Sequence, residues 1–131
     1  MNHRMLAGVL FGALAVASLG AQAPVTSDRI LNAAREPQNW LTYGGTYSSQ
    51  RYSPLSQIAP ANVTQLESKW VLQNQVFGAW QANPIVVDGV MYLTQRPNDV
   101  MAVDAKTGRM YWLYRWTPSA DARVCCGANN R

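Results

Sequence analysis

The sequence predicts an all-β fold, organised as about one blade of a β-propeller. Three observations carry this prediction: two strong hairpin signals, a further short apolar run before them, and the close spacing of the strands they imply. Together they give four to five antiparallel strands within about 45 residues, a spacing typical of one propeller blade. The pattern alone leaves open an ordinary antiparallel meander within a β-sandwich.

The first hairpin signal is the dipeptide Asp88-Gly89, which separates the apolar runs 84–87 and 90–94. Both central positions of a two-residue hairpin turn need positive φ, which Gly adopts freely and Asp tolerates. We therefore expect two antiparallel strands joined by a tight turn at this dipeptide.

The second hairpin signal joins the runs 99–103 and 110–114 through a polar turn. Gly108 can take the left-handed conformation that the turn requires, and the side chains of Asp104 and Thr107 can bond nearby backbone amides. This turn is expected to be ordered by its own side chains.

The region before the hairpins is expected to hold a short helix, a loop-rich passage and one more strand. The helix is expected over Ser27–Arg35, with Ser27 as its N-cap and Pro37 just past its end. Residues 39–66 combine Gly, Ser and Pro with several aromatic residues, which suggests a segment packed on a larger body. The run Lys69–Gln73 is expected as the first strand.

Residues 1–23 have the pattern of a secretory signal peptide. A short basic start precedes an apolar stretch diluted by Ala and Gly, and Ala21-Gln22-Ala23 offers a cleavage site, with Pro24 leaving the exact cut open. The stretch is too short and too rich in small residues for a comfortable membrane span. We expect export to the periplasm and no stable membrane span after cleavage; an uncleaved anchor is the alternative.

The charges are scattered along the chain rather than gathered in a stripe. The net charge of +4 falls to +3 if Arg4 leaves with the signal peptide. No run of Lys and Arg interleaves with aromatic residues, so we expect no nucleic-acid partner. The seven acidic residues form no ligand-spaced cluster, and no metal ligand is assigned within these 131 residues.

A spaced motif, Ala-x-Asp-x-x-Thr-Gly-x-x-x-Trp, runs through the second hairpin. Its five specified positions are Ala102, Asp104, Thr107, Gly108 and Trp112. This motif resembles the tryptophan docking motif of quinoprotein alcohol dehydrogenases, enzymes that use pyrroloquinoline quinone (PQQ). In that family the Trp of each blade packs on its neighbour and locks eight blades into a ring, so the resemblance implies one blade of an eight-bladed propeller.

Cys125 and Cys126 are adjacent and are the only cysteines in the chain. From the spacing alone, two unpaired thiols, one of them core filler, are the simpler interpretation. The run from Cys125 to Arg131 resembles the quinone-binding segment of the methanol/ethanol dehydrogenase branch of the same family. That resemblance implies a disulfide between Cys125 and Cys126 over one face of the planar quinone, and a contact between Arg131 and the cofactor.

Gln81 departs from the pattern of that branch, which has a quinone-contacting Glu just before the first hairpin. An amide donates a hydrogen bond at any ordinary pH, whereas a carboxylate beside an anionic group must first be protonated. We expect Gln81 to keep the cofactor contact. Weakened cofactor binding and a merely polar strand-edge residue are the alternatives.

The resemblance covers residues 38–131 and implies a periplasmic dehydrogenase that oxidises a small alcohol. It implies PQQ and calcium, or a lanthanide, as cofactors and a cytochrome c as electron acceptor. Members of the family are much longer, so we expect an N-terminal fragment that is inactive alone, with its catalytic carboxylate and metal ligands beyond residue 131. The alternatives are a non-enzymatic PQQ-like propeller scaffold of the cell envelope and a degenerate member without cofactor.

The expected organisation has four parts. These are a signal peptide (1–23), an N-terminal helix and loop-rich segment (24–66), a first propeller blade with the docking motif (67–116), and the truncated start of the quinone-binding segment (117–131).

Overall fold

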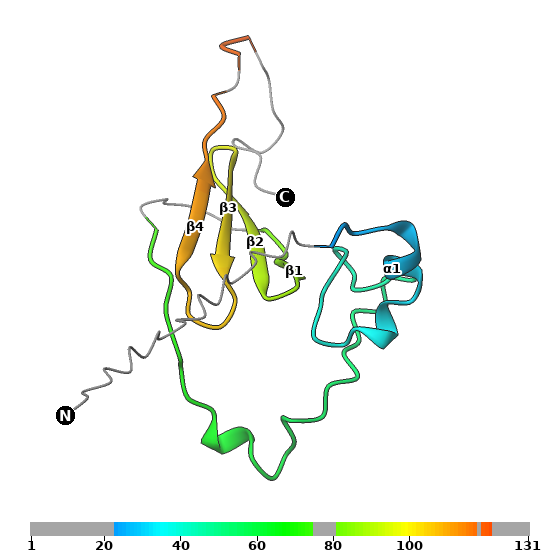
Figure 1. The fold of residues 1–131 in the computed structure, drawn as a ribbon. Coiled ribbons are helices and arrows are strands. Elements are labelled where there is room, and N and C mark those ends of the chain that lie inside the picture. The colour runs from blue at the N-terminus through cyan, green and yellow to red at the C-terminus, as the bar shows by residue number, and fades with distance from the viewer. Residues whose placement is uncertain (1–22, 75–80, 118, 122–131) are drawn as a thin grey trace, which may run out of the picture.

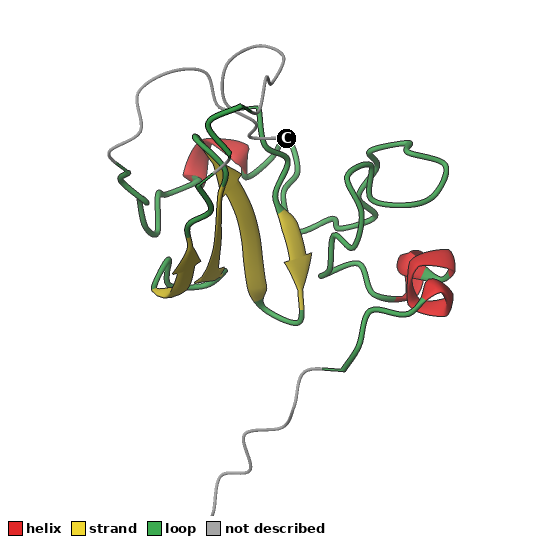
Figure 2. Cartoon of the chain, turned by 90° about the horizontal axis from the view of Figure 1, so that it is seen from above, coloured by secondary structure: helices red, strands yellow, loops and turns green. Residues whose placement is uncertain are grey.

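The computed structural model describes residues 23–74, 81–117 and 119–121 of the 131-residue chain (Figure 1). In chain order the elements are the helix α1 (Ser27–Leu31), the 3₁₀ helices η1 (Ala33–Arg35) and η2 (Val63–Gln65), and the strands β1 (Ile85–Val87), β2 (Val90–Gln95), β3 (Asp99–Asp104) and β4 (Met110–Tyr114). The strands form one sheet, and both views place α1 beyond its β1 edge (Figures 1 and 2).

The sheet is a four-stranded antiparallel meander in the order β1-β2-β3-β4. Strands β2 and β3 pair over their whole length, from Val90 opposite Asp104 to Gln95 opposite Asp99. The β3–β4 register shifts between Ala102 and Val103, as at a β-bulge. Both predicted hairpins are therefore confirmed, and together they make one blade-like unit.

The turn between β1 and β2 has the geometry that its dipeptide predicts. Asp88 has a φ of 48° and Gly89 a φ of 81°, so both central residues are left-handed, as a two-residue hairpin turn requires. A Cβ at Gly89 would have no neighbour within 4 Å. The glycine is therefore needed for its backbone conformation and not for close approach.

The turn between β3 and β4 is ordered by its own side chains, as predicted. Oδ1 of Asp104 accepts from the backbone N–H groups of Lys106 and Thr107 at 2.9 and 2.8 Å. The Thr107 hydroxyl accepts from the N–H of Arg109 at 3.3 Å, and Gly108 is left-handed with a φ of 73°. These local bonds fix the shape of the turn before any neighbour packs on it.

The core described by the structure is small and centred on β3. Met101, Ala102 and Val103 are at most 1 % exposed, whereas β4 is largely exposed. Only five hydrophobic residues are classed as buried across the described ranges: Leu41, Val87, Met101, Ala102 and Val103. The sheet therefore presents apolar surface for which the described part of the chain provides no cover.

The predicted N-terminal helix is shorter than expected and has a different cap. The N-cap is Thr26 and not Ser27, because the extended Thr26 places its hydroxyl to accept from the N–H of Arg29 at 3.2 Å. The helix ends at Leu31, where the next residue, Asn32, leaves helical geometry with a φ of −100° and a ψ of 24°, and the chain continues as η1.

The predicted strand Lys69–Gln73 is wrong. Within the described residues no strand lies beside this run, so it has no ladder of backbone hydrogen bonds and is not a strand. Its Trp70 instead packs on the turn between β3 and β4.

Over the described ranges, every helix is too short to serve as a membrane span.

Candidate functional site

Of the four residues predicted to contact a cofactor, the structure describes one. Cys125, Cys126 and Arg131 lie outside the described residues, whereas Gln81 is described and is exposed. The geometry of the candidate site is therefore built from Gln81 and the end of the sheet from which the chain continues.

Gln81 and the chain that follows β4 belong to the same end of the sheet. Because each strand is antiparallel to the next, the start of β1 lies at the end where β2 and β4 finish. Gln81 lies four residues before β1, and Arg115–Thr117 leave β4 at this end. The topology thus brings Gln81 and the chain that leaves β4 to one end of the blade-like unit.

A hollow of about 520 Å³ opens at the same end of the sheet. Inside it Gln95 is 6 % exposed and its Nε2 donates to Oδ2 of the equally buried Asp99 at 2.9 Å. Oε1 of Gln95 is buried without a hydrogen-bond partner in the described part of the chain. Because a buried acceptor without a partner is costly, this end of the sheet is chemically suited to contact further polar groups. The lining is Leu72–Asn74, Gln95–Pro97, Asp99, Met101, Met110, Leu113 and Arg115–Thr117.

The segment between Gln81 and β1 is held by the N-terminal loop. Trp40 pairs with Val86 through two backbone bonds of 2.8 and 3.0 Å, which adds a one-residue bridge to the β1 edge. The carbonyl of Tyr43 accepts from the indole N–H of Trp40 at 3.4 Å and from the side-chain amide of Asn83. Neither Asn83 nor Tyr43 was singled out as a site residue from the sequence, because a bond between residues forty positions apart leaves no local signal.

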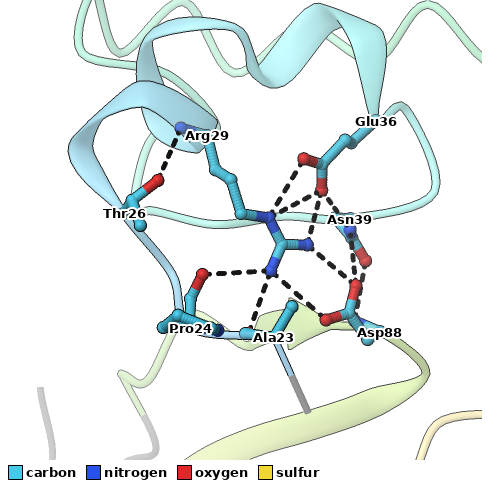
Figure 3. A network of polar contacts seen from close by, with 7 residues as sticks. All are labelled: Ala23, Pro24, Thr26, Arg29, Glu36, Asn39 and Asp88. Carbon is cyan, nitrogen blue, oxygen red and sulfur yellow. Dashed lines mark hydrogen bonds and ion pairs between the residues drawn. The ribbon is translucent and has the colours of Figure 1, made fainter.

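A second polar cluster ties α1 to the hairpin turn (Figure 3). The guanidinium of Arg29 lies between two carboxylates: Nη2 is 2.6 Å from Oε2 of Glu36 and 2.8 Å from Oδ1 of Asp88. Nη1 of Arg29 also donates to the carbonyl of Ala23 at 3.2 Å. The amide of Asn39 donates to both carboxylates, at 2.7 and 3.2 Å, and its oxygen accepts from the N–H of Asp88.

The charges of this cluster shift each other's ionisation. Hydrogen bonds from Arg29 hold the pKa of both Glu36 and Asp88 below their ordinary values, with Asn39 adding to the effect. The same bonds, that to Glu36 first, raise the pKa of Arg29. All three groups are therefore ionised at neutral pH, and the cluster is an anchor for the N-terminal segment rather than a proton donor or acceptor.

The docking motif carries an indole on its turn, and that indole belongs to Trp70. A Cβ at Gly108 would lie 2.6 Å from Cδ2 and Cε3 of Trp70, so the ring rests directly on the glycine. Nε1 of Trp70 donates to the carbonyl of Ala105 at 3.2 Å. The motif's own Trp112 is 46 % exposed and lies 6.1 Å from the ring of Tyr92.

The remaining motif residues build the platform under Trp70. Ala102 is fully buried in β3. Asp104 accepts from the hydroxyl of Tyr111 at 2.8 Å, and this bond, followed by the amide bonds of the turn, lowers the pKa of Asp104. The sequence carried one signal for this docking position, a Gly turn that exposes flat peptide surface on which an indole can stack.

Within the described ranges, no three His, Cys, Asp or Glu side chains come together as a candidate metal centre.

A four-stranded antiparallel sheet is what each blade of a β-propeller contains. Residues 40–130 match the PQQ family of glucose/ethanol/alcohol dehydrogenase β-propeller domains. The chain belongs to this family and is a homologue of PQQ-dependent alcohol dehydrogenases.

Three relatives illustrate the match. The dehydrogenase subunit of the quinone alcohol dehydrogenase of Gluconacetobacter polyoxogenes is 39 % identical over 127 residues, covering 95 % of this chain and 17 % of that protein. The solved structure of quinohemoprotein alcohol dehydrogenase ADHIIG from Pseudomonas putida HK5 is 47 % identical with a TM-score of 0.69, covering 71 % of this chain and 14 % of that one. A europium-containing methanol dehydrogenase is 29 % identical with a TM-score of 0.64, covering 71 % and 17 %.

The chain spans about a sixth of the length of the curated relatives that it matches, 17 % and 18 % in the first cases.

Proposed function

We propose that this chain is the N-terminal part of a periplasmic dehydrogenase that oxidises a small alcohol with PQQ and passes the electrons to a cytochrome c. The observation that carries the proposal is the family match over residues 40–130, a range that includes both cysteines. The relatives support the proposal, since they are named as quinone or quinohemoprotein alcohol dehydrogenases and the match covers nearly the whole of this chain. The part present here is inactive alone, because its catalytic carboxylate and metal ligands lie beyond residue 131.

The cofactor contacts assigned to this chain are Cys125, Cys126, Arg131 and Gln81. Their chemistry fits a flat quinone that bears carboxylates: a disulfide between Cys125 and Cys126 offers a compact stacking surface, Arg131 a permanent forked cation, and Gln81 an amide donor. Of these, Gln81 is the described member, and its exposed position before β1 leaves the residue accessible to a ligand.

Chain length allows these residues to meet. The axes of β1 and β4 are separated by three strand spacings, about 14 Å. The chain from Thr117 to Cys125 can extend at most about 27 Å, at ~3.4 Å per residue. A quinone near Gln81 is therefore within reach of the cysteine pair.

In this mechanism the residues of the chain bind and orient, and none of them moves a proton. The bound quinone supplies the hydride acceptor, and calcium or a lanthanide supplies the Lewis acid. The disulfide limits access of water to one face of the site, Arg131 balances negative charge at its edge, and Gln81 donates a hydrogen bond without first taking up a proton.

The exposed Trp112 supports assembly of this unit with further blades. Trp70 docks on the turn of this blade through Gly108 and the Ala105 carbonyl. By the same chemistry Trp112 would dock on the corresponding turn of a following blade, and repetition of that contact would close an eight-bladed ring. In the fragment alone Trp112 would stay exposed to solvent, and the free energy of burying its ring would not be gained.

The proposal is tested on the exported full-length gene product, reconstituted with PQQ and calcium. We expect one quinone bound per chain, detected by its absorbance, and reduction of an electron-accepting dye when ethanol is added. A Cys125→Ser, Cys126→Ser double variant should lose most of the bound quinone. A folded protein that binds no quinone would instead be a scaffold or a degenerate family member.

Gln81 has its own test in the same protein. We expect Gln81→Glu to bind quinone no more tightly at pH 7 than the wild type, because the introduced carboxylate is ionised there and cannot donate. A much tighter complex of the Glu variant at neutral pH would mean that Gln81 marks a weakened site.

A further inference from the structure

We propose that the Asp88-Gly89 turn is a site of spontaneous aspartate isomerisation, and that the contacts of Arg29 and Asn39 with the Asp88 carboxylate suppress this reaction. The inference concerns a covalent modification of the chain itself. It does not depend on the proposed function, because Asp88 is not among the proposed quinone contacts.

The sequence supplies the dipeptide that this reaction favours. Asp88 is followed by Gly89, whereas each of the other aspartates among these 131 residues is followed by a residue with a side chain. The nitrogen of a glycine has no neighbouring Cβ to hinder its approach to the aspartyl side chain. Asp88 is therefore the aspartate of these 131 residues that its neighbour leaves most open to attack.

The reaction has two steps and needs only water. In the first step the backbone nitrogen of Gly89 bonds to Cγ of Asp88, and a carboxyl oxygen leaves as water with the acid proton and the amide proton. The product is a succinimide ring. In the second step water opens the ring: attack on Cγ restores aspartate, and attack on the main-chain carbonyl of Asp88 gives isoaspartate. No atom is gained overall and nothing is oxidised or reduced.

The turn leaves room for both steps. A Cβ placed on Gly89 would have no neighbour within 4 Å, so no side chain crowds the attacking nitrogen. The side chain of Asp88 is 35 % exposed, so the water that opens the ring can reach the site. Protection against isomerisation must therefore come from the groups that hold the carboxylate.

Those groups contact both oxygens of the carboxylate (Figure 3). Nη2 of Arg29 donates to Oδ1 of Asp88 at 2.8 Å, and Nη1 donates to Oδ2 at 3.3 Å. The side-chain amide of Asn39 donates to Oδ1 at 3.2 Å. Ring closure brings Cγ to bonding distance from the nitrogen of Gly89 and removes one carboxyl oxygen, which ends the two-point contact with Arg29. The anchor must therefore open before the ring can close.

The two guarding side chains are themselves held in place. Nε and Nη2 of Arg29 also donate to Glu36, at 3.0 and 2.6 Å, and the Arg29 side chain is only 17 % exposed. Asn39 is buried, and its side-chain oxygen accepts from the backbone N–H of Asp88 at 2.9 Å. Because both residues have partners besides the carboxylate, opening of the anchor requires several contacts to break together.

The charge of Arg29 adds a chemical restraint to the geometric one. Its hydrogen bonds lower the pKa of Asp88, with Asn39 adding to the effect. A carboxylate anion resists attack by an amide nitrogen, because its oxygen leaves only after protonation. The lowered pKa reduces the protonated fraction of Asp88 at neutral pH, and with it the fraction that can react.

Isomerisation would undo the anchor that suppresses it. In isoaspartate the main chain runs through Cβ and Cγ, so the turn gains a backbone atom and the free carboxylate is attached to Cα instead. The turn now sets Val87 opposite Val90, and a longer turn strains that pairing. The displaced carboxylate no longer meets the guanidinium of Arg29, so the helix α1 loses its attachment to the hairpin.

The experiment follows isoaspartate at position 88 of the full-length protein during incubation at pH 7. Peptides that contain this position are separated by chromatography and identified by mass spectrometry, and the isomer is recognised by its resistance to a protease that cleaves before aspartate. A synthetic peptide of residues 84–94 gives the rate without the anchor. We expect the wild-type protein to isomerise at least about tenfold more slowly than this peptide.

Two variants of Arg29 separate the contribution of the anchor from that of the turn. We expect Arg29→Gln to isomerise about tenfold faster than the wild type, the factor that corresponds to one charge-assisted hydrogen bond. Arg29→Lys keeps the charge but loses the two-point contact, so its rate should lie between the two. Arg35→Gln is the matched control, because it removes the same charge from an exposed residue of η1 and should react at the wild-type rate.

Hydrogen exchange of the same samples separates opening of the anchor from unfolding. Faster isomerisation in Arg29→Gln, with faster exchange over 24–39 and wild-type exchange over 99–114, supports the inference. Four results would each overturn it: a wild type as fast as the peptide, a wild-type rate in Arg29→Gln, an equal acceleration in Arg35→Gln, or an acceleration that accompanies unfolding of the whole sheet in both Arg29 variants. None of these results bears on quinone binding.

Discussion

Replacing Gly108 by Ala should destabilise its turn by more free energy than the same change at Gly89 destabilises the other turn. Both glycines are left-handed, with φ of 73° and 81°. An L-residue in that conformation costs about 1–2 kcal/mol, so this part of the penalty is common to both variants. The two variants differ in the room that is available for the added Cβ atom. A Cβ at Gly89 meets nothing within 4 Å, whereas one at Gly108 meets the ring of Trp70 at 2.6 Å.

The extra penalty at Gly108 can be worked from the contacts that Trp70 would lose. Its hydrogen bond to the Ala105 carbonyl contributes about 0.5–1.5 kcal/mol, and forcing a methyl group into a packed contact costs about 1–3 kcal/mol. Gly108→Ala should therefore cost about 1.5–4.5 kcal/mol more than Gly89→Ala. Since each 1.4 kcal/mol is a factor of ten in an equilibrium constant, local opening should become at least about tenfold more frequent.

Hydrogen exchange of the full-length protein, followed by mass spectrometry, measures this opening directly. Peptides over 99–114 report on Gly108→Ala, and peptides over 85–95 on Gly89→Ala. Adding Trp70→Ala to Gly108→Ala should change little, because the indole is already displaced. Equal effects of the two glycine variants, or a large further effect of Trp70→Ala, would refute the docking of Trp70 on this turn.

Two further predictions follow from the anchor and from the small core. The anchor carboxylates of Glu36 and Asp88 have pKa values below their ordinary 4.5 and 3.8, so the stability that they contribute is fully present above those values and is lost as pH falls through the lowered ones. The thermal midpoint of the full-length wild type should exceed that of Arg29→Gln at pH 7, and the difference should shrink as the pH falls below the ordinary pKa values of these carboxyls; a difference independent of pH would contradict this ionisation. The 131-residue chain expressed alone should aggregate or remain partly unfolded, because in the part that the structure describes five hydrophobic residues are buried and many more are exposed, Tyr111 and Trp116 among them. A sharp cooperative melting transition of a soluble monomer would contradict that expectation.

Local chemistry explains why the sheet could be predicted from the sequence. The Asp88-Gly89 turn and the Asp104–Gly108 turn are determined by residues within a few positions of each other, through left-handed glycines and side-chain bonds to neighbouring amides. The N-terminal helix was also predictable in place, but not in length. Thr26 and Ser27 are both favourable N-cap residues. Which of them caps the helix depends on backbone geometry that the sequence does not reveal.

Interactions between distant parts of the chain explain the failures. Lys69–Gln73 has the composition of a strand, yet a strand needs a neighbour, and in the described residues this run meets a turn instead. The bond from Asn83 to Tyr43 and the ion pair of Arg29 with Asp88 join residues 40 and 59 positions apart. Pattern and propensity carry no information about such pairs, so the residues that hold the N-terminal helix and the segment before β1 could not be predicted from the sequence.

In the proposed function, the chain contributes a cysteine-pair lid and an amide donor to a bound quinone. Mass spectrometry of the exported full-length protein tests it most directly, under native conditions for the cofactor and denaturing conditions for the thiols. We expect one PQQ per chain and a peptide containing Cys125 and Cys126 that is lighter by two hydrogens than its reduced form. Two free thiols together with no bound quinone would contradict it.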